Sequence, residues 1–352
     1  MKPQPPRPRR LSILLALSLV ACGGGVARAQ GANPQTQTSS PPVQSPAQAP
    51  AQPPAPSPAT SHVKVDVIVT DESNRFVADL RQEDFRIEED GAARPITFFA
   101  QEALPLSYSL LVDNTGSLRT MFERVLKTGE TIVAGKSAED EMSVVRFVSR
   151  DRIELMQDFT RNRHALVAAL EEMYVEGGTT ALTEALYVAA EAVVARAPGE
   201  TRRRALVVIT DGGERDPRAN LDELLKYLRR HRVAVFVFGL TEAMSGDAFE
   251  QVKGGRRKSR ETLDMLARET GGLAVFPKKP AEFDAAALAL NARLQMPRYT
   301  LGYVPPADAS NKPRKIKIKL ADSALNDARK LHLHADFYVR GATVEATAPA
   351  RK

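Results

Sequence analysis

The sequence predicts an α/β fold, namely a doubly wound, mainly parallel sheet with a small flanking β domain made from N- and C-terminal strands. Three observations support this class. Short apolar runs alternate with amphipathic stretches between residues 105 and 294, as in a parallel sheet covered by helices on both faces. Strand-like alternation precedes this region and returns after it. At 352 residues, the chain is long enough to bury a substantial core.

Residues 1–29 are predicted to be a secretory signal. Three arginines precede the apolar run 11–21, which is shorter than the about 20 residues that a membrane-spanning helix needs. Two cleavage sites fit the sequence. One follows Ala29, and the other precedes Cys22, where residues 19–22 resemble a bacterial lipobox whose cysteine would carry a lipid anchor. Either route predicts export to the periplasm, the cell envelope or the medium, and the second predicts an outer-membrane lipoprotein.

Composition excludes several classes of fold and partner. Cys22 is the only cysteine, so the chain has no internal disulfide and relies on its core for stability. Residues 1–29 contain five basic residues and no acid, and removing them from the formal net charge of +6 leaves about +1. The charge therefore does not indicate nucleic-acid binding. No later stretch is long and apolar enough to predict a transmembrane helix in the mature chain.

Residues 30–61 consist almost entirely of Pro, Gln, Ala, Ser and Thr, which is typical of a disordered linker. Such a segment is either a spacer that holds a domain away from an anchor or a tail without a role. Residues 62–103 are then predicted to form several short antiparallel strands. Valines alternate with other residues from Val63 to Val69, and the stretches DESN and EDGAAR provide turns.

Residues 104–290 are predicted to form the α/β domain. A last helix near 281–294 leads into a second β segment, 291–342, and residues 343–352 are predicted to be a tail. We expect the two β segments to pack together as one domain into which the α/β unit is inserted. The predicted strands of the chain from residue 104 are 108–113, 143–149, 205–211, 233–240, 272–276, 298–306, 314–322 and 330–341. The predicted helices before the last one are 118–133, 164–173, 183–197, 220–231 and 260–270.

Oxygen-bearing side chains gather where predicted strands end. In the stretch SLLVDNTGS, Asp113 ends a strand, and Thr115 and Ser117 follow at alternate positions. Asp211 ends a second strand, and Thr179 follows a glycine pair in the loop before a helix. Ligands of open parallel sheets bind beyond the carboxyl ends of the strands, so these five side chains are candidate ligands of one ion. Their oxygen-only chemistry predicts Mg²⁺, or Ca²⁺ or Mn²⁺, rather than zinc or copper.

These residues resemble the metal-ion-dependent adhesion site (MIDAS) of von Willebrand factor A (VWFA) domains. The stretch Asp113-x-Thr115-x-Ser117 is similar to the family motif Asp-x-Ser-x-Ser, with threonine in place of the first serine. Thr179 in GGTT matches the isolated threonine of the family, and Asp211 in VVITDGG matches its second aspartate. The threonine keeps a hydroxyl ligand at the changed position.

The resemblance covers about residues 104–290, and the flanks extend it to about 62–342, where they resemble the VWFA-related Acidobacterial domain family. It implies a Mg²⁺ ion with an open position that a carboxylate of a protein partner fills. The implied function is an exported, metal-dependent protein-binding or adhesion module. In an alternative interpretation, Asp113 and Asp211 only cap helices or bind loop amides.

Two other functions stay open. One is a metal-independent structural or assembly protein of the cell envelope, and the other is a metal-dependent hydrolase. The sequence contains no Gly-x-Ser-x-Gly motif, no His-Glu-x-x-His motif and no reactive-cysteine arrangement, so we expect the protein not to be an enzyme.

Three further patterns lead to weaker expectations. The basic run 254–260 is predicted to lie in a loop at the metal edge, where it either steers an acidic partner or is only solvated. His332 and His334 are predicted to be exposed positions of one strand. The alternating lysines of 314–319 are typical of a protected edge strand.

Overall fold

A computed structural model describes residues 63–199, 201–214, 220–243, 255–306, 314–321, 330–338 and 343–346. The predicted signal, the candidate lipid anchor at Cys22 and the predicted linker lie outside the described residues. Within the described part, no helix is both long enough and apolar enough to cross a bilayer.

The α/β unit is built on a six-stranded sheet, which confirms the predicted fold class. Five neighbouring strands run parallel, and β7 at one edge runs antiparallel to β6. In spatial order the strands are β10 (Ala274–Val275), β9 (Val233–Gly239), β8 (Arg203–Thr210), β5 (Leu106–Asp113), β6 (Glu141–Ser149) and β7 (Arg152–Thr160).

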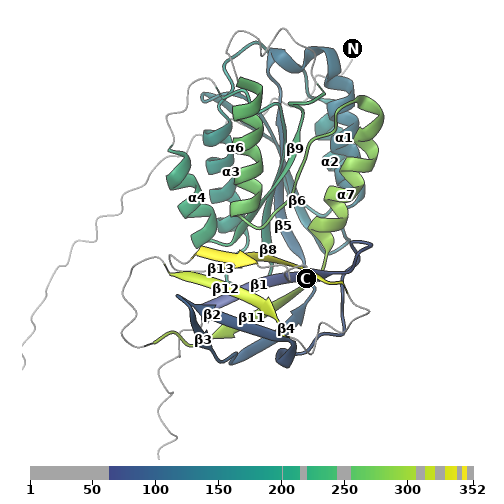
Figure 1. Cartoon of the computed structure of the whole chain (residues 1–352). Helices are drawn as coiled ribbons and strands as arrows, with labels where there is room; N and C mark the ends of the chain where they lie inside the picture. Colours follow the sequence, from purple (N-terminus) through teal and green to yellow (C-terminus); the bar gives the residue numbers. More distant parts are fainter. Residues whose placement is uncertain are drawn as a thin grey trace, which may run out of the picture. The chain divides into compact units, whose positions relative to one another are not determined.

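Helices cover both faces of this sheet (Figure 1). Side chains of α1, α2 and α7 pack on one face, and side chains of α3, α4 and α6 pack on the other. The helices are α1 (Phe122–Ala134), α2 (Arg163–Glu171), α3 (Leu182–Arg196), α4 (Leu221–Arg230), α6 (Gly255–Glu269) and α7 (Phe283–Gln295), with short 3₁₀ helices η2 (Gly116–Met121) before α1 and η3 (Pro280–Glu282) before α7.

The position of β5 explains its apolar sequence. It pairs with β6 on one side and β8 on the other, and helices cover both faces, so all eight of its residues are buried. Alternate residues point to opposite faces of the sheet: Leu110 packs in one core and Leu111 in the other. Asp113 at the end of this strand is therefore delivered to the sheet edge by a rigid, fully packed element.

Strands from the two ends of the chain pair with one another, as predicted. Two four-stranded sheets enclose a third core that includes Val67, Phe85, Tyr299 and Ile316. One sheet has the order β13 (His332–Tyr338), β1 (Val63–Thr70), β11 (Arg298–Tyr303) and β4 (Phe98–Glu102). The other has the order β14 (Thr343–Ala346), β12 (Lys315–Leu320), β2 (Phe85–Glu89) and β3 (Ala92–Arg94), and the 3₁₀ helix η1 (Gln82–Asp84) precedes β2.

The structure corrects three sequence predictions and adds one strand. The lysine-rich strand β12 is not an edge strand, because β2 and β14 flank it. β14 lies in the segment predicted to be only a tail. Residues 255–260 begin helix α6 rather than belonging to a loop. Strand β7 was not predicted: Ile153, Leu155 and Phe159 pack against one core, but Met156 and Gln157 interrupt the alternation of apolar and polar side chains. The exposed positions of His332 and His334 are confirmed.

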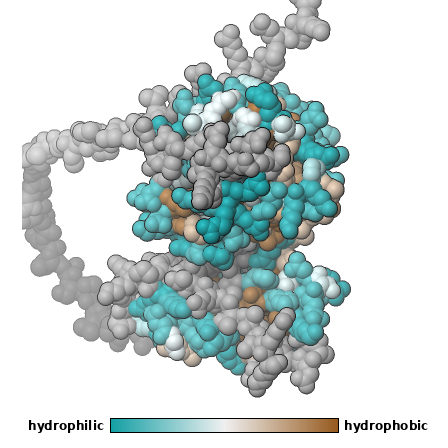
Figure 2. Space-filling model, turned by 45° about the horizontal axis from the view of Figure 1, so that its top comes forward, coloured by the Kyte–Doolittle hydropathy of each residue, from teal (hydrophilic) through white to brown (hydrophobic). Residues whose placement is uncertain are grey.

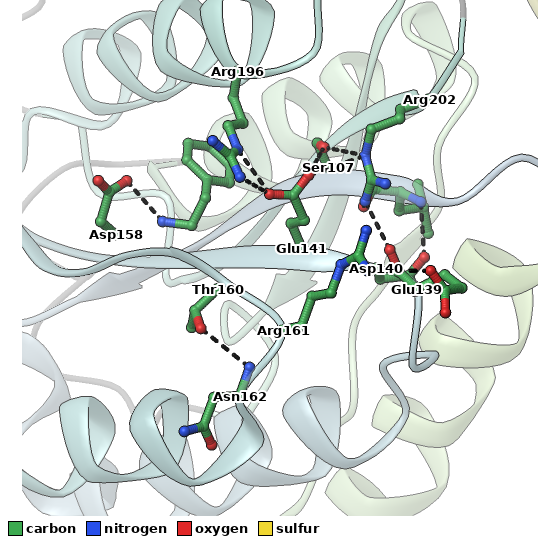
Figure 3. A network of polar contacts seen from close by, with 12 residues as sticks. Ser107, Glu139, Asp140, Glu141, Asp158, Thr160, Arg161, Asn162, Arg196 and Arg202 are labelled. Atoms are coloured by element: carbon green, nitrogen blue, oxygen red, sulfur yellow. Dashed lines mark hydrogen bonds and ion pairs between the residues drawn. The ribbon is translucent and has the colours of Figure 1, made fainter.

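A network of charged side chains ties elements together where β5 and β6 begin, at the end of the sheet opposite Asp113 (Figure 3). Glu141 accepts a hydrogen bond of 2.7 Å from Arg196 at the end of α3 and pairs with Arg202 at 3.2 Å. Asp140 accepts 2.7 Å and 2.8 Å bonds from the backbone of Leu106 and from Gln295. These contacts anchor the starts of the central strands.

Candidate metal site

The Asp113 loop forms a compact set of oxygen atoms just after β5. Asp113 is fully buried, and its Oδ1 accepts hydrogen bonds from the backbone N of Thr115 at 3.0 Å and from its Oγ1 at 2.7 Å. The hydroxyls of Thr115 and Ser117 lie 3.0 Å apart. Three of the five predicted ligands are therefore together, as the alternate spacing predicts.

Asp211 joins this set from the neighbouring strand. β5 and β8 are parallel neighbours, with Val112 beside Ile209, so the residues that follow both strands meet at the same edge. Asp211 is only 2 % exposed, and its Oδ1 accepts a 2.9 Å bond from Gly213 N. Asp113 and Asp211 thus each accept a hydrogen bond from a loop amide through Oδ1. Such bonds are what we expect if the two aspartates only bind loop amides.

The two aspartates repel one another. Burial and the negative charge of Asp211 raise the pKa of Asp113 to about 7, although hydrogen bonds from Thr210 and Thr115 act in the opposite direction. Among the described residues, neither carboxylate forms an ion pair with a lysine or arginine. A buried carboxylate pair without a cationic side chain is unfavourable, and a bound cation would offset this cost.

Thr179 lies in the loop between α2 and α3, and its side chain is exposed. The described contacts contain no hydrogen bond between Thr179 and the other four predicted ligands. The loop itself is held close to the Asp113 loop, because Glu176 N donates a 2.9 Å bond to Asn114 O and Asn114 Nδ2 donates a 2.9 Å bond to Tyr174 O. Its backbone also packs closely at Gly178, where an added Cβ would lie 2.5 Å from a methyl carbon of Val148.

Three ties made by other residues connect the three segments that carry the predicted ligands. Thr210 Oγ1 donates a 2.7 Å bond to Asp113 Oδ2 and joins the β8 and β5 ends. Asn114 joins the Asp113 loop to the Thr179 loop. Glu214 Oε2 accepts 2.8 Å bonds from Thr183 N and Oγ1 and joins the Asp211 loop to the start of α3.

None of these tying residues was predicted from the sequence. Thr210 carries a recognisable signal, since a hydroxyl directly precedes Asp211 at the end of a buried strand. Asn114 and Glu214 carry no local signal, because their partners lie 60 and 31 residues away. Their roles follow only from the way in which the strands are ordered in the sheet.

Arg146 on β6 contacts the loop that carries Thr179. This β6 side chain is 4 % exposed, donates a 2.9 Å bond to Glu154 and lies 3.4 Å from Glu176. Its guanidinium carbon is 4.6 Å from the centre of the Tyr174 ring, a cation–π contact. Charge pairing and ring contact therefore hold the loop segment 174–176 on β6.

Gly212 lets α6 pack against the Asp211 loop. Its φ of +72° favours glycine, and an added Cβ would lie 2.9 Å from a methyl carbon of Leu263 in α6. In the second turn of the same helix, Arg260 pairs with Glu242 at 2.7 Å and lies 4.7 Å from the ring centre of Phe276. This arginine of the basic run is therefore engaged within the domain.

The residues fit a hard cation. Two buried carboxylates and two hydroxyls lie just beyond the neighbouring strands β5 and β8, and all are oxygen donors of the kind that Mg²⁺ binds. The described residues contain no group of three or more His, Cys, Asp or Glu side chains that could hold a metal. An ion here would therefore depend on hydroxyl groups and water as well as on Asp113 and Asp211.

Figure 2 shows the molecule with the top of the Figure 1 view brought forward. The described surface in this view is mainly hydrophilic, and its hydrophobic residues form small separate areas (Figure 2). A partner that met this face would therefore make polar contacts for the most part.

Comparisons with known proteins agree with this architecture. Residues 109–284 match the family model described as von Willebrand factor type A domain. No curated protein matches the chain.

Among solved structures, the chain is similar to an aerotolerance-related membrane protein from Bacteroides fragilis, with 20 % identity, a TM-score of 0.43, and coverage of 54 % of this chain and 98 % of that one. It is also similar to a von Willebrand factor type A protein from Catenulispora acidiphila, with 13 % identity, a TM-score of 0.46, and coverage of 76 % and 75 %.

Proposed function

The chain belongs to the von Willebrand factor type A domain family, and from this premise we propose that it is an exported, metal-dependent module that binds an acidic side chain of a protein partner. Domains of this family bind protein partners in general. The proposed ligands of the ion are Asp113, Thr115, Ser117, Thr179 and Asp211. Export rests on the predicted signal in residues 1–29.

The observation that carries the proposal is the repulsion between the buried carboxylates of Asp113 and Asp211. Two buried carboxylates share a sheet edge, hydroxyls of Thr115 and Ser117 adjoin them, and the pKa of Asp113 is raised to about 7 by burial and by the charge of Asp211. Asp113 and Asp211 would hold a divalent cation, which would offset this repulsion and supply positive charge. We propose Mg²⁺, with Ca²⁺ and Mn²⁺ as alternatives, because the donors are all hard oxygens.

The chain's own residues would orient the ion and leave part of its coordination open. Asp113 and Asp211 would supply charge, and the hydroxyls of Thr115, Ser117 and the exposed Thr179 would supply neutral ligands. Few protein carboxylates on the ion keep it electrophilic, so a carboxylate of a partner binds with a charge-assisted contact.

A pull-down tests the proposal. The mature chain with a C-terminal tag is incubated with cell-envelope extract in Mg²⁺ or in EDTA, beside an Asp113→Ala variant. We expect a partner that is retained in Mg²⁺ and lost in EDTA and in the variant, while circular dichroism shows that the variant is folded. The matched control is Asp264→Ala, which removes an exposed carboxylate of α6 and should leave binding unchanged.

Retention of the same partner in EDTA would contradict the metal-dependent function and favour a metal-independent assembly role. Turnover of a substrate that is lost in Asp211→Ala without loss of binding would instead indicate a hydrolase.

A further inference from the structure

We propose that Glu214 is a positioning residue of the metal site, which holds the Thr179 loop against the Asp211 loop through Thr183. The inference rests on the proposed function, since it concerns how two of the proposed ligands reach one ion. Glu214 itself is not proposed as a ligand.

The position of Glu214 in the chain makes its contact informative. It follows Asp211 by three residues, and Thr183 follows Thr179 by four. Glu214 Oε2 accepts bonds of 2.8 Å from both the backbone N and the Oγ1 of Thr183. The two segments that bring Thr179 and Asp211 to the site are therefore joined by a pair of short, charge-assisted hydrogen bonds.

The contact replaces a local helix cap. Helix α3 begins at Leu182, and its N-cap residue, Ala181, has no side chain that can accept a hydrogen bond. In α2 and α4 the residue directly before the first turn supplies this cap, namely Asn162 and Asn220. In α3 the acceptor comes instead from the Asp211 loop, so the start of α3 is tied to that loop.

The environment of Glu214 is unfavourable for a carboxylate, apart from this contact. Its Oε1 is buried and has no hydrogen-bond partner within the described residues. Burial raises its pKa and the charge of Glu184 adds to this rise, while the bonds from Thr183 oppose it. Asn162, by contrast, caps α2 from an exposed position and carries no such cost.

The two ends of the Thr179 loop are thus held by different partners. Asn114 binds the loop at Tyr174 and Glu176, and Glu214 binds it at Thr183. Thr179 lies between these points with an exposed side chain. If the Glu214 contact is lost, the Thr179 loop keeps its tie to the Asp113 loop but loses its direct tie to the Asp211 loop.

The test measures Mn²⁺ affinity from the electron paramagnetic resonance signal of the free ion, with the full mature chain. We expect Glu214→Ala to weaken Mn²⁺ binding about tenfold or more, as is typical when residues that orient metal ligands are removed. Glu214→Gln keeps an acceptor for Thr183 and should stay within about threefold of wild type. Thr183→Val removes one of the two donors, keeps the side-chain shape, and should fall between these values.

Asn162→Ala is the matched control, because it removes a helix cap with two amide donors at the opposite end of the sheet. It should lower thermal stability by a similar amount to Glu214→Ala but leave Mn²⁺ affinity unchanged. If Glu214→Ala does not fold, the Mn²⁺ affinities of Thr183→Val and Glu214→Gln are compared instead. Weaker binding in Thr183→Val than in Glu214→Gln then supports the positioning role.

Three outcomes would overturn the inference. Unchanged Mn²⁺ affinity in Glu214→Ala and Thr183→Val would show a purely structural cap. Equal loss of Mn²⁺ affinity in Glu214→Gln and Glu214→Ala would show that Glu214 acts through its negative charge and not through its hydrogen bonds to Thr183. Absence of Mn²⁺ binding in the wild-type chain would remove the inference and the proposed function together, whereas the first two outcomes leave the proposed function intact.

Discussion

The hydroxyl of Thr210 donates a 2.7 Å hydrogen bond to Oδ2 of Asp113, across the boundary between β8 and β5. The same hydroxyl accepts a 2.9 Å bond from Gly212 N. One side chain therefore fixes the rotamer of Asp113 and the backbone turn that contains Asp211. The geometry of the candidate metal site is set in part by a residue that is not a proposed ligand.

Thr210→Val keeps the shape of this side chain and removes both bonds. We expect it to lower the free energy of unfolding by about 1–3 kcal/mol, because a buried carboxylate oxygen loses its donor. Urea denaturation measures this loss. Mn²⁺ affinity should fall as well, since the orientation of Asp113 is no longer held.

The control for Thr210→Val is Thr128→Val, which removes a buried hydroxyl bonded to Arg124 O inside α1. It should cost some stability and leave Mn²⁺ affinity unchanged. Equal Mn²⁺ affinities in wild type and Thr210→Val would contradict the orienting role.

The raised pKa of Asp113 predicts how stability depends on pH without metal. Its pKa is about 7 in the folded chain, through burial and the charge of Asp211, and about 3.9 for an unfolded aspartate. Between these values the folded state binds more protons, so its contribution to the free energy of unfolding falls as pH rises from about 4 to 7. In EDTA, Asp113→Asn should therefore have a flatter stability profile over this range than wild type.

Added Mg²⁺ should reverse this loss. At pH 7.5, saturating Mg²⁺ should raise the melting temperature of the wild type by about 3 °C or more and leave that of Asp113→Asn unchanged. Differential scanning calorimetry at several pH values measures both effects. Parallel pH profiles for the two proteins in EDTA would show that Asp113 titrates normally and would sink this prediction.

A buried ion pair joins β1 to the turn before β9. Arg232 binds Asp66, whose Oδ1 also accepts a 2.8 Å bond from Thr300. Burial alone would raise the pKa of Asp66, but the charges of Arg232 and Arg298 and the bond from Thr300 lower it overall. The stabilising contribution of Asp66 is therefore present at neutral pH and is lost as pH falls below about 4.

Arg232→Met should lower the free energy of unfolding by about 3 kcal/mol at pH 7, because the buried carboxylate of Asp66 loses the positive charge of Arg232. The difference from wild type should shrink as the pH is lowered below about 4, because the unfolded chain then protonates Asp66 more readily than the folded wild type. Arg268→Met is the surface control, since its pair with Asp264 is exposed and should change stability by about 0.5 kcal/mol at most. Equal effects of the two changes would count against a role for the buried pair.

Arg146 predicts the behaviour of the Thr179 loop. Arg146→Met removes the charge that contacts Glu154, Glu176 and the Tyr174 ring, and leaves apolar bulk in its place. We expect faster amide hydrogen exchange in residues 174–180, because this part of the loop loses its support on β6. Exchange in α4, which lies on the other face of the sheet, is the internal reference and should not change. Equal amide hydrogen exchange of residues 174–180 in wild type and Arg146→Met would show that the hydrogen bonds of Asn114 hold this loop without Arg146.

Much of the α/β unit could be predicted because its signals are local. The apolar runs of β5, β8 and β9 reflect burial on both faces, and amphipathic stretches mark the helices between them. β7 escaped prediction because an edge strand that is half-buried needs no strict pattern. The place of β12 inside a sheet was also not predictable, because alternating lysines suit an edge or one exposed face of a central strand equally well.

The sequence by itself determined that oxygen-bearing side chains stand where two buried strands end, since Asp113 and Asp211 end apolar runs and Thr115 and Ser117 follow Asp113 at alternate positions. Only the tertiary structure decided how these ends are held together. Strand order places β8 beside β5, so that Thr210 reaches Asp113 and Glu214 reaches Thr183 over long separations along the chain. Local patterns record whether a residue is buried, whereas a hydrogen bond between distant segments depends on which strands become neighbours.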